Sequence, residues 1–184
     1  MTEKLIIAGA GGQGIMLLGK ILAEAAMRER ECVTWLPAYG AEVRGGTAYC
    51  MVVISKKEIG SPFISKADTI IIMNAPSLHK FGPRMREKGL MVINSSLLKP
   101  GLWAPADAFR CPFTEMAIAL GNIKVANMIA LGYYLGKKKI VDAGTVREVI
   151  ADNAPAGKRE LIAINHKALE RGIECAHGKS TICP

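Results

Sequence analysis

The sequence lacks any apolar run long enough to cross a membrane. No stretch of its 184 residues reaches the roughly 18 consecutive apolar residues that a transmembrane helix needs. Glu3 and the glycines from Gly9 onward interrupt the N-terminal apolar segment, so it does not read as a signal peptide. We therefore expect a cytoplasmic protein that has no membrane partner.

Aromatic residues and cysteines are also few. Aromatics make up 5% of the chain, and its five cysteines lie far apart, at Cys32, Cys50, Cys111, Cys175 and Cys183. An odd number of dispersed cysteines without an export signal is typical of reduced thiols in a cytosol. The spacing of a cluster-binding ferredoxin motif is absent. Cys175, His177 and Cys183 have no fourth ligand at zinc-site spacing, so we expect no metal site in this chain.

Positive charge exceeds negative charge, but it is spread along the chain. Lys and Arg total 24 against 16 Asp and Glu, which gives a formal net charge of +8. The only basic run is Lys137–Lys138–Lys139. Nucleic-acid binders usually concentrate basic residues in a stripe or a tail. The distribution therefore argues against nucleic acid and fits a polyanionic small ligand or an acidic protein partner.

Half of the residues are apolar, and they form short runs that alternate with helical patterns. Apolar runs predict six strands, at residues 4–8, 32–36, 47–54, 69–73, 90–93 and 108–111. Helical patterns cover residues 15–30, 76–88, 114–135 (interrupted near Gly121), 142–151 and 158–172. This alternation predicts an α/β fold: a three-layer, mostly parallel Rossmann-like sheet with helices on both faces. We expect a single domain over residues 1–176 and a C-terminal tail over residues 177–184.

A glycine-rich turn connects the first predicted strand to the first helix, with the sequence Gly9-Ala10-Gly11-Gly12-Gln13-Gly14. Gly9, Gly11 and Gly14 satisfy G-x-G-x-x-G, in which glycines permit a tight turn, close backbone approach to a ligand and close helix packing. The N–H groups and partial positive charge at the helix N-terminus favour a phosphate. Packing alone requires neither Gly12 nor Gln13, and a Gln amide both donates and accepts hydrogen bonds.

An NAD site also needs an acidic residue at the end of the second strand, where it binds the ribose 2′-hydroxyl. That position reads Trp35-Leu36-Pro37-Ala38, and Glu31 precedes the strand. An ordinary dinucleotide site is therefore disfavoured. Three alternatives stay open: a stand-alone NAD- or FAD-dependent Rossmann oxidoreductase, a non-enzymatic nucleotide-binding scaffold, and glycines that only form a close turn.

A second unusual segment follows the second predicted strand and reads Tyr39-Gly40-Ala41-Glu42-Val43-Arg44-Gly45-Gly46. Taken alone, it also fits a solvated turn with an exposed ion pair. Combined with GAGGQG, and with the later segment Gly121-Asn122-Ile123-Lys124-Val125-Ala126-Asn127-Met128, it resembles the gamma subunit of the 2-oxoacid:ferredoxin oxidoreductases. The resemblance covers residues 3–172. The Y-G-x-E-x-R-G-G form is similar to the 2-oxoglutarate and branched-chain 2-oxoacid members.

The resemblance implies a multi-subunit enzyme that oxidatively decarboxylates a 2-oxoacid, with 2-oxoglutarate favoured, to an acyl-CoA and reduces ferredoxin. Such a complex uses thiamine diphosphate, Mg, iron–sulfur clusters and coenzyme A. This chain has neither the family's G-D-G thiamine pattern nor a cluster motif. The implied partners are thiamine diphosphate-bearing alpha and beta subunits and a ferredoxin-like subunit. The chain itself is expected to hold no catalytic residue and to be inactive alone.

Coenzyme A is strongly anionic, and the resemblance assigns structure and part of the CoA-facing surface to this chain. The expected cofactor-binding residues come from the two loops and the later helix: Gly9, Gly11, Gly12, Gln13, Gly14, Tyr39, Glu42, Arg44, Gly45, Asn122 and Lys124. Arg44 and Lys124 would supply positive charge to phosphate groups. For Asn122, Lys124 and Asn127, the alternative role is hydrogen bonding to backbone or to a neighbouring subunit.

Overall fold

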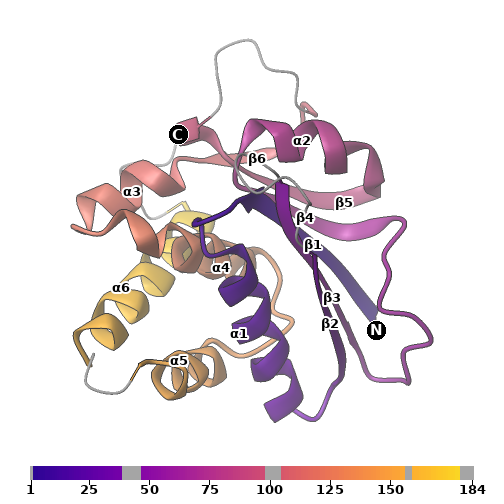
Figure 1. Ribbon diagram of the computed structural model, residues 1–184, viewed down its shortest axis with the longest axis horizontal. Coiled ribbons are helices and arrows are strands. Elements are labelled where there is room, and N and C mark those ends of the chain that lie inside the picture. Colours follow the sequence, from indigo (N-terminus) through magenta and orange to yellow (C-terminus); the bar gives the residue numbers. More distant parts are fainter. Residues whose placement is uncertain (1, 39–46, 98–104, 156–158, 179–184) are drawn as a thin grey trace.

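The computed structural model describes residues 2–38, 47–97, 105–155 and 159–178. Within these residues, a single six-stranded sheet has the order β2-β3-β1-β4-β5-β6 (Figure 1). The strands are β1 (Thr2–Ala10), β2 (Cys32–Ala38), β3 (Thr47–Ser55), β4 (Ala67–Ile72), β5 (Met85–Asn94) and β6 (Phe109–Cys111). The paired strands β1-β4, β4-β5 and β5-β6 are parallel, whereas β3 is antiparallel to both β1 and β2. The predicted mostly parallel α/β sheet is confirmed.

The position of β3 distinguishes this sheet from a standard dinucleotide-binding order, in which the first and second strands are neighbours. Here β3 lies between β1 and β2. Residues 50–55 of β3 are all buried, whereas no residue of β2 is fully buried. A strand that is apolar on both faces is stable in the sheet interior, so β3 takes the inner place and β2 the edge.

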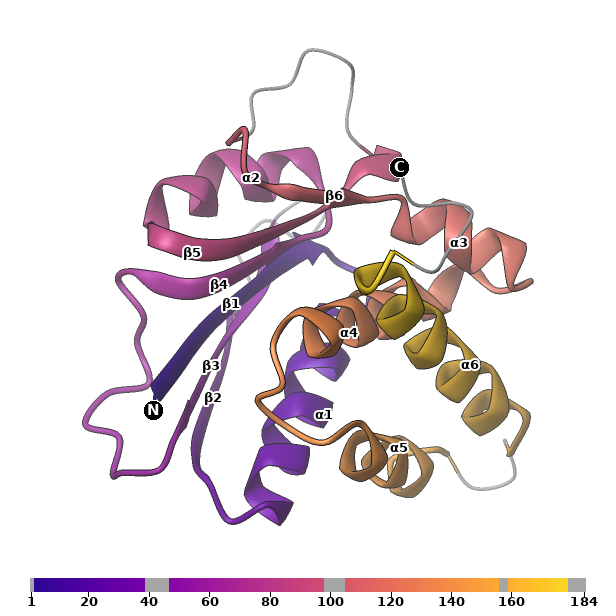
Figure 2. The same ribbon diagram turned by 180° about the vertical axis from the view of Figure 1, so that it is seen from behind.

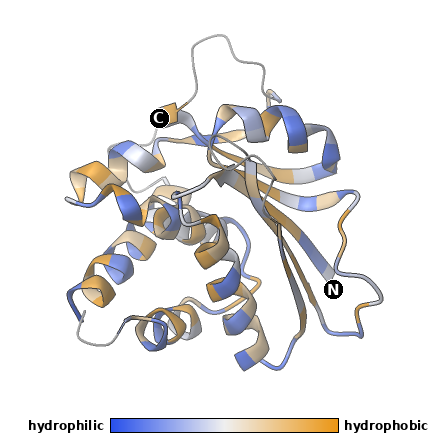
Figure 3. Cartoon of the chain, in the orientation of Figure 1, coloured by the Kyte–Doolittle hydropathy of each residue, from blue (hydrophilic) through white to orange (hydrophobic). Residues whose placement is uncertain are grey.

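Helices cover both faces of the sheet, but unequally (Figures 1 and 2). On one face lies α2 (Ala75–Phe81), whose Leu78 and Phe81 pack in the smaller core. The other face carries the larger core and the remaining helices: α1 (Ile15–Arg28), α3 (Phe113–Ala119), α4 (Ala126–Lys137), α5 (Ala143–Asp152) and α6 (Arg159–Ala176). Figure 3 shows polar and apolar residues alternating along α5 and α6, as expected of helices that cover a core with one side.

The most buried helix is α4, in which residues 126–135 are all buried. It packs against α6 at two glycines. A Cβ at Gly132 would lie 2.0 Å from the Leu169 carbonyl oxygen, and a Cβ at Gly172 would lie 2.0 Å from the Ile129 carbonyl oxygen. The backbones of α4 and α6 therefore approach each other closely because neither glycine carries a side chain.

Several predicted boundaries are wrong. The second helix ends at Phe81 rather than at residue 88, and β5 already begins at Met85. Pro83 explains this end, because proline has no N–H to donate to the carbonyl four residues earlier, and the chain continues as the 3₁₀ turn Gly82–Arg84. The last helix continues to Ala176, past the predicted end at residue 172. The long helix predicted over 114–135 does divide at Gly121, which has φ 87°, as expected.

The cysteines follow the prediction only in part. Cys32 is exposed and Cys50 is buried, and both are thiols. Cys175 is disulfide-bonded, so the expectation of reduced thiols is wrong for this residue. Its Sγ also lies 3.1 Å from the Sγ of Cys111 in the larger core. Among the helices of the described ranges, none is both long and apolar enough to span a membrane.

Candidate functional site

The carboxyl ends of the parallel strands meet at one edge of the sheet, where ligands of open α/β folds usually bind. The glycine turn leaves β1 at this edge, after Ala10. The start of β3 lies beside it, because Thr47 is paired with Ala10, and Ala38 at the end of β2 is paired with Tyr49. Four predicted site residues lie outside the described residues, namely Tyr39, Glu42, Arg44 and Gly45.

Two glycines of the turn are required by packing. A Cβ at Gly9 would lie 2.6 Å from Gln13 Oε1 and 2.9 Å from Met73 Cβ. Gly14 precedes α1 with φ 71°, in the left-handed region, and a Cβ there would lie 2.3 Å from Asn127 Nδ2. For Gly9 and Gly14, close packing of strand, turn and helix is therefore a sufficient explanation.

The other two glycines leave backbone exposed. Gly11 and Gly12 are exposed, and a Cβ on either would meet no heavy atom within 4 Å. The φ of 85° at Gly12 favours glycine by itself, but Gly11 has neither a positive φ nor a close neighbour. Beside them, the N-terminus of α1 has no side-chain cap and no acidic residue in its first turn. Bare N–H groups and the helix dipole there suit an anionic ligand.

Gln13 fixes the shape of the turn. Its Oε1 accepts a hydrogen bond from the Ala10 N–H over 2.7 Å, and its Nε2 donates to the Met73 carbonyl over 3.1 Å. Met73 directly follows β4, the parallel neighbour of β1. The Gln13 amide thus links the end of β1 to the residue that follows β4. We interpret Gln13 as a residue that positions the backbone of the open glycines Gly11 and Gly12.

A cavity of about 180 Å³ opens beside the turn. It brings the glycine turn together with the segment before α4, because its lining residues are Gly12, Gln13, Met73, Leu97, Thr114, Ile123, Lys124 and Ala126. Three of the residues expected to bind the cofactor, Gly12, Gln13 and Lys124, therefore line the same cavity. Lys124 is exposed, so its ammonium group is available to an anion. An apolar wall, bare backbone N–H groups and one lysine suit an amphipathic anion.

The wall residues Met73, Leu97, Thr114, Ile123 and Ala126 were not singled out from the sequence. Met73 follows β4, whereas the other four lie in the 3₁₀ turn Ser95–Leu97, in α3, in the 3₁₀ turn Ile123–Val125 and in α4, and only the fold brings them together. Thr114 is held by Asn94 at the end of β5, whose Nδ2 donates to the threonine Oγ1 over 2.9 Å. The rule that ligands bind at strand carboxyl ends could have indicated Met73, which comes directly after β4.

The two asparagines of the later segment bond to backbone, which is the alternative role that the sequence left open. Asn122 Oδ1 accepts the Lys124 N–H over 3.0 Å and caps the short 3₁₀ turn Ile123–Val125. Asn127 is only 2% exposed, and its amide bonds to the Gly14 carbonyl and the Met128 N–H. Of the three polar residues, Lys124 is the one that lines the cavity.

The strand order also argues against a dinucleotide site. Because β3 separates β1 from β2, the end of β2 lies about 10 Å from β1, at the usual spacing of roughly 4.8 Å per strand. Residues 32–38 and 47–49 contain no acidic residue. Glu31 precedes β2 and so lies at the amino end of that strand, away from the glycine turn. The carboxylate that would bind an adenosine ribose is therefore missing from the described end of β2 and from the start of β3.

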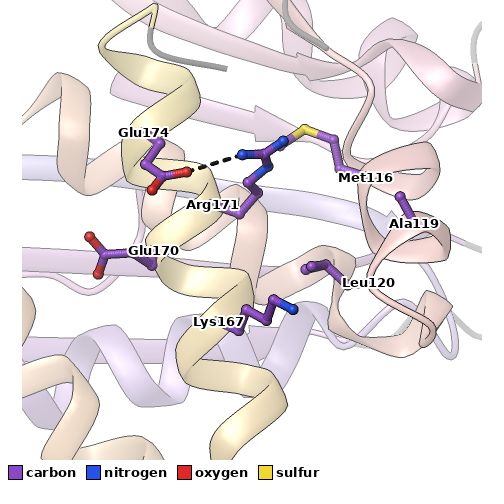
Figure 4. Close-up of a pocket in the computed structure, with 7 residues that line it drawn as sticks. All are labelled: Met116, Ala119, Leu120, Lys167, Glu170, Arg171 and Glu174. Atoms are coloured by element: carbon purple, nitrogen blue, oxygen red, sulfur yellow. Dashed lines mark hydrogen bonds and ion pairs between the residues drawn. The ribbon is translucent and has the colours of Figure 1, made fainter. Parts of the chain in front are cut away.

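A second cavity, of about 380 Å³, lies between α3 and α6 (Figure 4). Met116, Ala119 and Leu120 form its apolar side. Arg171 on α6 pairs there with Glu174 over 3.2 Å, so its charge is already matched. No residue predicted to bind a cofactor lines this cavity.

A family model described as pyruvate ferredoxin/flavodoxin oxidoreductase matches residues 4–175. The chain belongs to this family. The ketoisovalerate oxidoreductase subunit VorA of Methanothermobacter thermautotrophicus is 37% identical over 171 residues, which cover 92% of this chain and 35% of VorA. The 2-oxoglutarate synthase subunit KorC of Methanocaldococcus jannaschii is 31% identical over 182 residues, which cover 96% of this chain and 95% of KorC. The chain thus spans about a third of VorA but nearly all of KorC.

Solved structures of the family share the fold. The gamma subunit of a keto/oxoacid ferredoxin oxidoreductase from Geobacter sulfurreducens matches with a TM-score of 0.79 and 25% identity, over 96% of this chain and 99% of that one. A 2-oxoglutarate:ferredoxin oxidoreductase from Magnetococcus marinus, solved with 2-oxoglutarate, coenzyme A and succinyl-CoA bound, matches with a TM-score of 0.83. It is 23% identical, and the match covers all of this chain and 32% of that one, so it supports the fold alone. The resemblance to the gamma subunit is confirmed.

Proposed function

We propose that this chain serves a complex that oxidatively decarboxylates a 2-oxoacid to an acyl-CoA and reduces ferredoxin, and that it supplies part of the CoA-facing surface. One observation carries the proposal: Gly12 and Lys124 line one apolar-walled cavity, next in sequence to the open Gly11 and close to the uncapped N-terminus of α1. Coenzyme A combines phosphates with a long, weakly polar arm, which this combination of groups suits.

The cavity supports a partial role for this chain. At about 180 Å³ it is below the roughly 300–1,000 Å³ typical of sites that enclose a whole ligand. The chain would therefore contact one portion of coenzyme A, and partner subunits would cover the rest. Thiamine diphosphate, when bound in the partner subunits, supplies the electron sink for decarboxylation, and iron–sulfur clusters carry the electrons. The residues of this chain hold and orient the acyl acceptor.

Lys124 gives the sharpest test. In the complex reconstituted with its sister subunits, Lys124→Ala should raise the KM for CoA by roughly 10- to 100-fold, because a hydrogen bond between charged groups is worth about 1.5–3 kcal/mol. The KM for the 2-oxoacid should stay nearly constant. Lys137→Ala is the matched control, because Lys137 ends α4 and lies over the Phe109 ring, outside the cavity lining. An unchanged CoA KM in Lys124→Ala would overturn the assignment.

Arg44 extends the test to the second loop. If Arg44 also serves the CoA phosphates, Arg44→Ala should raise the KM for CoA more than the KM for the 2-oxoacid. Comparing kcat/KM for 2-oxoglutarate, ketoisovalerate and pyruvate in the same complex identifies the substrate, for which we propose 2-oxoglutarate. Micromolar binding of NAD or FAD to the isolated chain would instead favour a stand-alone oxidoreductase.

A further inference from the structure

A buried threonine, Thr114, lines the cavity beside the glycine turn. It is only 9% exposed, and most of its described neighbours in the cavity wall are apolar, among them Met73 and Ile123. The other polar side chains of the lining differ from it in kind. Both ends of the Gln13 amide are bonded to backbone, and Lys124 is charged and exposed. Thr114 is therefore the neutral hydroxyl among the described residues of this lining.

Asn94 fixes the hydrogen-bonding role of the Thr114 hydroxyl. Asn94 ends β5 and is fully buried. Its Oδ1 accepts the Thr114 N–H over 3.4 Å, and its Nδ2 donates to the Thr114 Oγ1 over 2.9 Å. The opposite orientation of the amide would turn its NH₂ group toward the Thr114 N–H, which is also a donor. The backbone of Thr114 thus determines the orientation of the amide, and the threonine oxygen is an acceptor toward Asn94.

The hydroxyl proton of Thr114 remains available for a further bond. A hydroxyl donates one hydrogen bond in addition to those that its oxygen accepts. Within the described part of the chain, the Thr114 hydroxyl makes no hydrogen bond other than the one from Asn94. A buried donor without an acceptor is unfavourable. The hydroxyl is therefore set to donate to an acceptor atom of a molecule that occupies the cavity.

We propose that the Thr114 hydroxyl donates a hydrogen bond to an amide carbonyl in the pantetheine arm of coenzyme A, and so selects this arm for the apolar part of the cavity. The inference rests on the proposed function of the chain. A neutral donor among apolar side chains suits a neutral acceptor, because a phosphate would lose water there without gaining a cation. The pantetheine arm carries amide groups between apolar segments, which matches this environment.

The phosphates of coenzyme A have better partners at another part of the same cavity. Lys124 is exposed, and the start of α1 offers N–H groups without a side-chain cap. Thr114 belongs to α3 and Lys124 to the 3₁₀ turn Ile123–Val125, and both line this cavity of about 180 Å³. One ligand can therefore meet both residues. This division of roles predicts that the threonine and the lysine respond to different portions of coenzyme A.

Kinetics of the complex reconstituted with its sister subunits test the proposal. Thr114→Val removes the hydroxyl at nearly constant volume. It should raise the KM for CoA by roughly 3- to 10-fold, which corresponds to the loss of one hydrogen bond between neutral groups. The KM for the 2-oxoacid should stay constant. Thr114→Ala provides a second variant if Thr114→Val does not fold.

The nucleotide portion of CoA, adenosine 3′,5′-bisphosphate, is the second probe, because it lacks the pantetheine arm. Its inhibition constant against CoA should stay constant in Thr114→Val and should rise in Lys124→Ala. A rise in Thr114→Val would place the hydroxyl at the nucleotide and would overturn the assignment to the arm.

Two variants separate this effect from a general loss of structure. Thr114→Ser keeps the hydroxyl and should hold the KM for CoA within about twofold of the wild-type value. Thr69→Val removes another buried hydroxyl, which donates to Glu3 and lies outside the cavity lining. It should lower the melting temperature and leave the KM for CoA unchanged.

The outcomes for Thr114 and Lys124 can be told apart. A raised KM for CoA in Lys124→Ala but not in Thr114→Val would overturn the role of Thr114 and leave the proposed function standing. An unchanged KM in both variants would overturn both. An equal rise in Thr114→Val and Thr69→Val would show that the effect is structural, which also overturns the assignment.

Discussion

Asn127 donates a hydrogen bond from its Nδ2 to the backbone carbonyl of Gly14 over 3.1 Å, across 113 residues of sequence. The same carbonyl accepts the Leu18 N–H over 3.0 Å within α1. One acceptor therefore joins the glycine turn to the start of α4, three residues after Lys124. This hydrogen bond therefore couples the position of the glycine turn to that of the segment that carries Lys124, on the other side of the cavity. A displacement of one part of the candidate site should shift the other.

Substitution by alanine should destabilise the fold at Gly14 and leave its stability almost unchanged at Gly11. Gly14→Ala requires a left-handed residue with a side chain, at a cost of roughly 1–2 kcal/mol, and its Cβ would also displace Asn127. Gly11→Ala meets no atom within 4 Å, so its folding stability should change by less than about 0.5 kcal/mol. Urea denaturation measures both values.

The same pair tests the ligand assignment. Gly11→Ala should raise the KM for CoA in the reconstituted complex, because a methyl group would stand where the backbone meets the ligand. If Gly11→Ala changes neither stability nor the KM for CoA, the open turn is not a contact surface.

Gln13 should prove structural through both ends of its amide. Gln13→Glu keeps an acceptor for the Ala10 N–H but turns an oxygen toward the Met73 carbonyl, so near pH 7 it should destabilise the fold by about 1–3 kcal/mol. Below the ordinary glutamic acid pKa of about 4.3, the protonated carboxyl can donate to that carbonyl again. The deficit relative to wild type should therefore shrink at acid pH in denaturation experiments, whereas the deficit of Gln13→Ala should not.

Features encoded in one continuous segment of the sequence could be predicted, whereas features that depend on contacts between distant segments could not. The run from Leu5 to Ala8 and the following glycines sit in one continuous segment, and they indicated the buried strand, the turn and the phosphate-type helix start. The place of β3 between β1 and β2 was not predictable in this way. It depends on which strand is hydrogen-bonded to a neighbour along both of its edges and covered on both of its faces, and the sequence of one strand does not show this. The cavity walls were also missed, since Met73, Leu97 and Ile123 share no motif and meet only in three dimensions.

The basic run Lys137–Lys138–Lys139 illustrates the same limit, because its members have different roles. Lys138 Nζ lies 2.9 and 3.0 Å from the two carboxylate oxygens of Glu3, whose side chain is only 8% exposed. Thr69 Oγ1 donates to the same carboxylate over 2.6 Å. Lys138→Met would leave a buried carboxylate without its cation and should destabilise the fold by about 3–5 kcal/mol.

Its neighbour provides the control. Lys137 lies 4.6 Å from the centre of the exposed Phe109 ring, so Lys137→Met should cost only about 0.5–1 kcal/mol. Adding Glu3→Gln to Lys138→Met removes the unpaired charge and should restore part of the stability. Equal losses in the two lysine variants, measured by urea denaturation, would contradict a buried ion pair at Lys138.

Alkaline pH should destabilise the folded chain, because buried neutral acids resist ionisation. Burial, with a smaller contribution from Cys111, raises the pKa of Tyr133 to about 12, from 10.0 in the unfolded chain. Burial also raises the pKa of Cys50 to about 12, from 9.0. The unfolded chain therefore releases these protons at lower pH than the folded chain, so the stability they contribute is complete below pH 9 and is lost as pH rises toward 12.

Urea midpoints should fall steadily above pH 9, and Tyr133→Phe should make that fall shallower. Midpoints that stay level to pH 11, or an equal slope in the variant, would contradict the burial of these two groups as the cause.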